Sequence, residues 1–244
     1  MTKAPALCLL TAILASGLSL GQSADPATVK RETKPNPALV PITDVVGLPR
    51  VLLIGDSISM GYTLPVRTLL AGKANVHRPR VNCGHTASGL EQLDAWLATG
   101  GADQKWDVIH FNWGLHDLKY VDEKGAISDV AAPGAKQQIS PEDYRKNLTA
   151  LTERLKATGA KLIWRNTTPV PEETKGRIAH AEAAYNTIAA EVMAAAGVPT
   201  HDLAAFVTAH QTEVQLPANV HFSTAGSDAL AAEVAREILG ALGQ

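Results

Sequence analysis

The sequence predicts an α/β protein in which helices cover both faces of a parallel β-sheet. Short apolar segments rich in β-branched residues recur along the chain, and segments with helical periodicity separate them. From Arg50 onward the two kinds of segment alternate. Strands that alternate with helices of this length form βαβ units, whose parallel sheets are buried on both faces. The chain of 244 residues is long enough for one full-sized domain and short for two.

Five segments are predicted as strands of this sheet. The first, 50–55 (RVLLIG), is a continuous apolar run, and the third, 106–113 (WDVIHFNW), is rich in β-branched and aromatic residues. The second, 74–81, is weaker. The fourth, 160–169, ends at a proline, and the fifth covers 197–203.

The helices have recognisable ends. Ser140 can cap a helix whose first residue is Pro141, and Gly159 stops it. Further helices are predicted over 177–196 and from about residue 224. Apolar residues recur on one face of each helix: Leu148, Leu151 and Leu155; Tyr185, Ile188 and Val192; Leu230, Val234 and Ile238.

The segment 119–138 does not follow this alternation, because it has no clear periodicity. Connections of this length inside a domain are usually functional or disordered. Two interpretations remain open: a lid or rim over the substrate, and a mobile surface insertion.

The first 49 residues are predicted to stand apart from the domain. Residues 1–24 combine an early lysine, an apolar stretch and a small-residue exit, which is typical of a secretory signal peptide. Residues 25–49, rich in proline and charge, predict a leader that wraps onto the domain or stays flexible. The domain itself is predicted over 50–244, and the location as secreted or periplasmic. Removal of the signal peptide would leave Cys83 as the sole thiol, so no internal disulfide is expected.

A serine stands where the first strand gives way to a helix, in the stretch VLLIGDSISMGY (51–62). Ligands gather at the carboxyl ends of parallel strands, and a helix start offers free N–H groups for an oxyanion. Ser57 is therefore a candidate nucleophile, although serine also commonly caps helices. A serine hydroxyl needs a base. His221, in a turn before the last helix, is the candidate.

The chain resembles the SGNH (GDSL-type) hydrolase superfamily in four short blocks that occur in the family's order. They are Gly55-Asp56-Ser57-Ile58, the stretch NCGHTASGL with Gly84, Gly114-Leu115-His116-Asp117 for the usual Gly-x-Asn-Asp, and Ala218-Asn219-Val220-His221 for the usual Asp-x-x-His. The resemblance covers residues 50–242. It implies a flavodoxin-like, three-layer sandwich with a five-stranded parallel sheet, Ser57 as nucleophile and His221 as general base. The amides of Ser57 and Gly84 would be oxyanion donors.

Two positions depart from the family pattern. His116 replaces the oxyanion asparagine; an imidazole N–H can still donate in the correct tautomer, and Asn112 is a fallback donor. Ala218 stands where the family has the acid that orients the histidine. Three explanations are open: a backbone carbonyl of the 217–219 turn orients His221 in a Ser-His dyad, Asp202 supplies the carboxylate, or the site is degenerate.

Together these features predict an exported serine esterase that acts through an acyl-enzyme on Ser57, with an O-acetylated carbohydrate as the simplest substrate. No cofactor or metal is expected, because the histidines lack the spacing of common zinc motifs. The near-neutral charge gives no indication of nucleic acid binding, and no membrane association is expected after signal removal. The alternatives are a non-catalytic carbohydrate-binding or scaffold protein on the same fold, and a thioester or sulfate ester as the substrate. The sequence carries no signal for an oligomeric state.

Overall fold

The computed structural model describes residues 1–2, 35–101 and 105–244. The predicted signal peptide from residue 3 onward, and the predicted leader as far as residue 34, lie outside the described residues. Residues 35–244 form one compact unit. Within the part of the chain that the structure describes, no helix has both the length and the apolar composition needed to cross a bilayer.

The core of this unit is a five-stranded parallel sheet with the strand order β2-β1-β3-β6-β7. Its strands are β1 (Arg50–Ile54), β2 (Asn75–His77), β3 (Val108–Phe111), β6 (Lys161–Arg165) and β7 (Thr200–His201). Every residue of β1, β2 and β3 is buried, as expected for strands covered on both faces. The predicted fold class is therefore confirmed.

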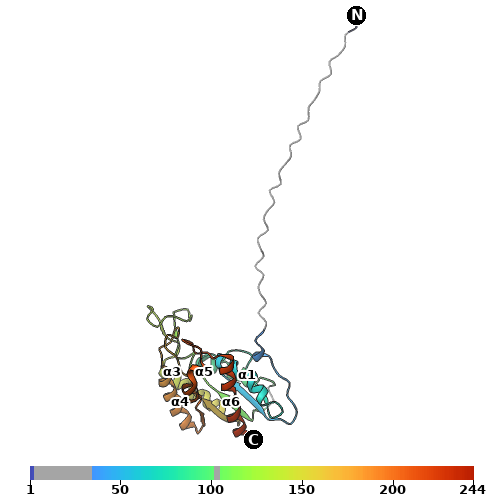
Figure 1. Cartoon of the computed structure of the whole chain (residues 1–244), viewed down its shortest axis with the longest axis vertical. Coiled ribbons are helices and arrows are strands. Elements are labelled where there is room, and N and C mark those ends of the chain that lie inside the picture. Colours follow the sequence, from blue (N-terminus) through green and yellow to red (C-terminus); the bar gives the residue numbers. More distant parts are fainter. Residues whose placement is uncertain (3–34, 102–104) are drawn as a thin grey trace. The chain divides into compact units, whose positions relative to one another are not determined.

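Helices cover both faces of the sheet. They are α1 (Ser57–Leu69), α2 (Thr86–Leu97), α3 (Pro141–Lys156), α4 (Glu182–Ala196), α5 (Leu203–Val214) and α6 (Thr224–Leu242). On one face α1 packs along α6, which also contacts α5; on the other α3 packs between α2 and α4. Figure 1 shows α1, α6 and α5 beside one another, and α3 next to α4.

The predicted helix faces are the buried ones. Ser140 caps α3 through its hydroxyl, and Leu148, Leu151 and Leu155 are fully buried. The predicted element bounds are less accurate. The strands are shorter than the apolar runs that predict them, α4 begins at Glu182 rather than at residue 177, and α5 was not expected.

The sequence leaves open the conformation of two segments, the leader and the insertion 119–138. The insertion, and the leader from residue 35 onward, are folded against the domain. Residues 35–49 begin with a short 3₁₀ helix, η1 (Pro37–Leu39), and Asp44 pairs with Arg50 at 2.7 Å and with His77 at 2.5 Å. In the insertion, β4 (Tyr120–Val121) and β5 (Lys136–Gln137) form an antiparallel pair.

The sheet order places the catalytic candidates. The chain leaves β1 toward β2 on one side, while β3 lies on the other side of β1. Ligands bind at such a switch point, outside the carboxyl ends of the strands. The segments that follow β1 and β3 contain Ser57 and His116.

Candidate active site

Ser57 is the first residue of α1, and its hydroxyl is not the helix cap. That function belongs to Asp56, whose Oδ1 accepts the N–H of Ile58 at 3.0 Å. The alternative in which Ser57 only caps the helix is therefore wrong. As the first residue of the helix, Ser57 also has an N–H group without an acceptor inside the helix.

The hydroxyl of Ser57 is bonded to His221. The distance from Oγ to Nε2 is 2.9 Å, although the two residues are 164 positions apart in the chain. His221 reaches Ser57 from the turn that precedes α6, whose N-cap is Ser223. The structure thus brings the predicted nucleophile and the predicted base into direct contact.

The other nitrogen of His221 is bonded to a side chain that the sequence analysis did not consider. Asn219 Oδ1 lies 2.7 Å from Nδ1 of His221 and also accepts the backbone N–H of His221 at 3.0 Å. An amide oxygen only accepts, so this contact assigns the proton to Nδ1 and directs the lone pair of Nε2 at Ser57. Ala218, with φ at 51°, turns the chain at this point.

This geometry overturns two of the three explanations given above for the missing acid, the backbone carbonyl and Asp202. The group that orients His221 is a side-chain amide, rather than a backbone carbonyl. Asp202 is engaged elsewhere: its Oδ1 caps α5 through the N–H of Ala205 at 3.0 Å and accepts from Asn166 Nδ2 at 2.6 Å. An asparagine two residues before a histidine was the available signal, because Asn side chains commonly accept the N–H two residues on.

Gly84 lies in the loop before α2, with φ at +59°, a conformation that favours glycine. Its N–H donates to Asn82 Oδ1 at 3.0 Å. The amide of Gly84 can therefore serve an oxyanion only when the side chain of Asn82 shares it or turns away.

His116 follows Gly114 and Leu115 in the turn after β3. Its surroundings favour the uncharged ring. Burial lowers the pKa of His116 to about 4, with the nearby carboxylate of Asp56 opposing that change. At neutral pH the ring is therefore uncharged and carries one N–H, which is what an oxyanion donor at this position requires.

Asp117, next to His116, is bonded to the start of α2. Its Oδ1 accepts from the N–H of Thr86 at 2.8 Å and from the hydroxyl of Thr86 at 2.6 Å, which fastens the loop to the start of α2. Burial raises the pKa of Asp117 to about 7. Its second oxygen, Oδ2, has no hydrogen-bond partner among the described residues.

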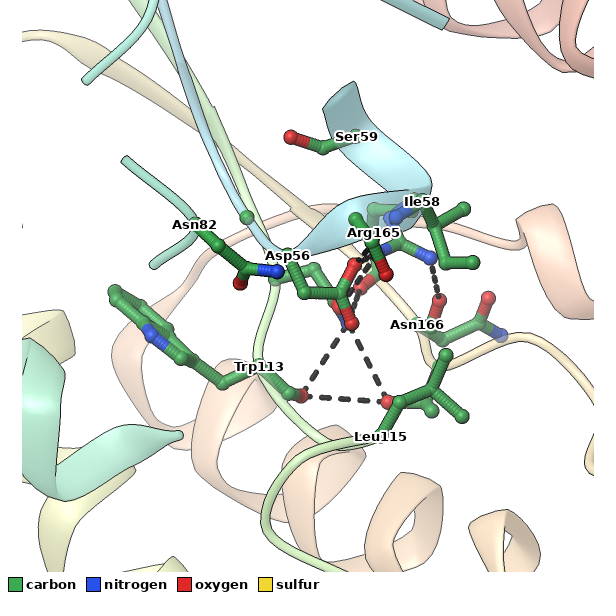
Figure 2. A network of polar contacts seen from close by, with 12 residues as sticks. Asp56, Ile58, Ser59, Asn82, Trp113, Leu115, Arg165 and Asn166 are labelled. Carbon is green, nitrogen blue, oxygen red and sulfur yellow. Dashed lines mark hydrogen bonds and ion pairs between the residues drawn. The ribbon is translucent and has the colours of Figure 1, made fainter. Parts of the chain in front are cut away.

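Asn112, the fallback oxyanion donor, is wrong in that role because its amide is used inside the sheet. Nδ2 donates to the carbonyl of Arg165 at 2.7 Å, and Oδ1 accepts from Arg165 Nη2 at 2.5 Å. Figure 2 shows the partner Arg165 between Asp56, at the start of α1, and Asn166, which follows β6. Asn112 therefore joins β3 to β6.

Two buried arginines, which the sequence analysis did not identify, hold the backbone around Ser57. Arg165 is fully buried, and its Nη2 lies 4.0 Å from Asp56 Oδ1. Arg78 donates from Nη2 to the carbonyls of Gly55 and Val81, both at 3.2 Å. Arg78 therefore connects the loop of the nucleophile to the loop that leads to Gly84.

Cys83 directly precedes Gly84, but it is buried and is not a candidate nucleophile. Burial raises the pKa of the Cys83 thiol to about 11, so Cys83 stays protonated. Across the described ranges, no group of three or more His, Cys, Asp or Glu side chains is placed to hold a metal ion.

A serine and an imidazole in contact at the carboxyl edge of a parallel sheet are the arrangement of a serine ester hydrolase of the SGNH type. The model of the GDSL-like lipase/acylhydrolase family matches residues 53–229, and the chain belongs to this family. The resemblance inferred from the four sequence blocks is therefore confirmed, and the protein is an esterase.

Solved structures share the fold. A lipase/acylhydrolase from Enterococcus faecalis is 22% identical with a TM-score of 0.61, over 79% of this chain and 96% of that one. The acetyl xylan esterase AlAXEase is 13% identical with a TM-score of 0.61, over 78% and 99%. Axe2, an acetylxylan esterase from Geobacillus stearothermophilus, is 16% identical with a TM-score of 0.60, over 80% and 94%. No curated protein matches the chain.

Proposed function

We propose that the protein is an exported esterase that removes an acyl group, most simply acetyl, from a carbohydrate through an acyl-enzyme on Ser57. The observation that carries the catalytic part is the 2.9 Å contact between Ser57 Oγ and His221 Nε2. A hydroxyl bonded to an imidazole lone pair is an activated nucleophile.

In the proposed reaction, Ser57 Oγ attacks the acyl carbon while His221 Nε2 takes the hydroxyl proton. The ester C–O bond then breaks, and the departing alcohol receives that proton from Nε2. Water repeats the sequence on the acyl-enzyme and releases the carboxylic acid. Throughout, Asn219 Oδ1 holds the Nδ1–H of His221 in place.

The negative charge that develops on the acyl oxygen would be bound at the start of α1. The N–H of Ser57 points out of a helix N-terminus, where the helix dipole favours an anion. The uncharged ring of His116 and the N–H of Gly84 would be the second and third donors. The removal of one such donor typically costs about 3–4 kcal/mol in the transition state.

The substrate class and the location have separate support. Two structures of similar fold are described as acetyl xylan esterases. They support an acetyl ester of a carbohydrate as the proposed substrate. Export is supported by the signal-like pattern of residues 1–24.

The test is hydrolysis of 4-nitrophenyl acetate and of acetylated oligosaccharides, with Ser57→Ala as the variant. We expect Ser57→Ala to lose at least about a thousandfold in kcat, as for other triad serines. A fluorophosphonate probe should label Ser57 in the wild type. Ser128→Ala, a change in the insertion, is the control and should keep both properties.

Two results would contradict the proposal. Unchanged hydrolysis in Ser57→Ala would remove this serine from the mechanism. Failure of the probe to label the folded wild type at any pH would favour the non-catalytic interpretation.

A further inference from the structure

Two cationic side chains from distant parts of the chain meet beside the active site. The N–H of Tyr120 donates to the carbonyl of Gly176 at 2.8 Å, which aligns the start of the insertion with the loop after β6. The neighbours of these two residues, Lys119 and Arg177, are therefore brought to the same place.

The guanidinium of Arg177 is fixed in orientation. Its Nε and Nη2 donate to the carbonyl of Leu115 at 3.1 and 2.9 Å, and Leu115 directly precedes His116. This edge of the group is used by the protein. A guanidinium has a second edge, formed by Nη1 and Nη2, which matches the two oxygens of a carboxylate.

Neither cation is neutralised by the protein. Among the described residues, no carboxylate oxygen lies within 4.0 Å of Lys119 or Arg177, although both side chains are partly buried. Asp129 and Glu173 line a shallow pocket with Arg177, but they form no ion pair with it. Buried charges are usually paired, and these two cations are partly buried without such a partner among the described residues.

The two charges lie within electrostatic range of the reacting groups. Burial lowers the pKa of His116, and the positive charges of Lys119 and Arg177 lower it further. Each is also affected at its own position: burial and then the charge of Arg177 lower the pKa of Lys119, while the carboxylate of Asp56 opposes the lowering of the pKa of Arg177 by burial.

We propose that Lys119 and Arg177 form a subsite for an anionic group, a carboxylate or a sulfate, carried by the sugar whose ester is cleaved. This inference rests on the proposed function, because it assigns the substrate class of the same site. It makes the substrate an acylated acidic polysaccharide, such as one built from uronic acids, rather than a neutral one.

The first test measures binding without catalysis. Trigalacturonate, a sulfated xylotriose and plain xylotriose are titrated calorimetrically into the Ser57→Ala protein at low salt. We expect at least one anionic ligand to bind at least about tenfold more tightly than xylotriose, and 0.5 M NaCl to remove most of that preference. The two anionic ligands distinguish a carboxylate from a sulfate.

The variants are Lys119→Gln and Arg177→Gln, with Lys124→Gln as the matched control from the exposed part of the same insertion. Lys119→Gln should weaken the anionic ligand about tenfold. Because Arg177 also holds the carbonyl of Leu115, its variant could disturb the loop, and Lys119→Gln alone decides the result. In the active enzyme, the same change should lower the ratio of kcat/KM for acetylated galacturonide to that for 4-nitrophenyl acetate by a similar factor.

The inference is overturned if neither anionic ligand binds better than xylotriose, or if Lys124→Gln loses as much as Lys119→Gln. Failure of the proposed function is a different result. In that case Ser57-dependent hydrolysis is absent while the preference for an anionic ligand, and its loss in Lys119→Gln, are still measured.

Discussion

The two halves of the catalytic pair are held in different ways. Ser57 stands above buried, charged side chains: Asp56 and Arg78 are 2% exposed, and Arg165 is fully buried. His221 stands on an exposed turn, and the side chain of Asn219 is the hydrogen-bond partner of its Nδ1.

This difference indicates what each side contributes. The position of the nucleophile depends on the same buried contacts that hold β1, β3 and β6 together, so changes there act first on stability. The orientation of the base depends on a surface turn, so changes there act on rate and leave the fold almost unaffected.

The largest expected effect comes from Arg165→Met. The change leaves Asn112 Oδ1 without its donor and Asp56 without the nearby cation. Breaking a buried polar pair from one side costs about 3–5 kcal/mol of unfolding free energy, measured by urea denaturation. Arg236→Met, which changes an exposed arginine of α6, should cost about 1 kcal/mol or less. Equal losses in both variants would contradict the stabilising role of the buried network.

On the histidine side, Asn219→Ala should lower kcat for 4-nitrophenyl acetate about 100-fold, because the correct tautomer and ring orientation are no longer enforced. Its thermal midpoint should stay close to that of the wild type, since the turn is on the surface. Asn219→Asp should retain activity, because a carboxylate oxygen accepts the same bond. Asp202→Asn is the control; a loss as large as that of Asn219→Ala would restore Asp202 as the orienting group.

A similar effect on rate is expected at the third element of the site. His116→Ala should lower kcat by about 100-fold or more through the loss of one oxyanion donor, while His116→Asn, which supplies an amide N–H, should keep more of the activity. Because burial lowers the pKa of His116 to about 4, the ring should not titrate in the kcat profile between pH 5 and pH 8. An unchanged kcat in His116→Ala would remove this residue from the oxyanion site.

The smallest effect is a change in the pH dependence of stability. The pKa of Asp117 is raised by burial to about 7 in the folded protein, above the ordinary value of 3.8. The folded state therefore binds more protons than the unfolded state between about pH 4 and pH 7, and the contribution of Asp117 to stability falls as the pH rises through this window.

Asp117→Asn keeps an oxygen for Thr86 and removes the ionisation. Between pH 6 and pH 8, the difference in unfolding free energy between Asp117→Asn and the wild type should shift by about 1–2 kcal/mol in favour of the variant, measured by urea denaturation at both values. A difference between the two proteins that does not change with pH would show that Asp117 is not ionising in this range.

The sequence predicts the fold well because periodicity reports burial directly. Leu148, Leu151 and Leu155 are all fully buried, and the continuous apolar run of 50–55 contains β1. The ends of strands are harder to predict. Apolar side chains such as Trp113 stay buried beyond the last residue of β3, so an apolar run extends past the hydrogen-bonded ladder.

The candidate site divides in the same way. Ser57 and His221 can be predicted because each stands at the end of a recognisable element. Asn219 depends on the left-handed conformation of Ala218, which a sequence pattern does not show for a residue other than glycine. Asn112 was misassigned because its side chain points between β3 and β6, where its partner Arg165 lies 53 positions away.

The contact between the first and last helices has a consequence for the time at which the protein becomes active. α1 packs along α6, where a Cβ on Gly61 would lie 3.2 Å from Ser227 Oγ, and the base enters the site from the turn just before α6. The hydroxyl of Ser57 can therefore meet its imidazole only after the 164 positions between the two residues have been translated and α6 has docked on α1. The nucleophile, which comes early in the chain, thus stays without its base until a late stage of folding.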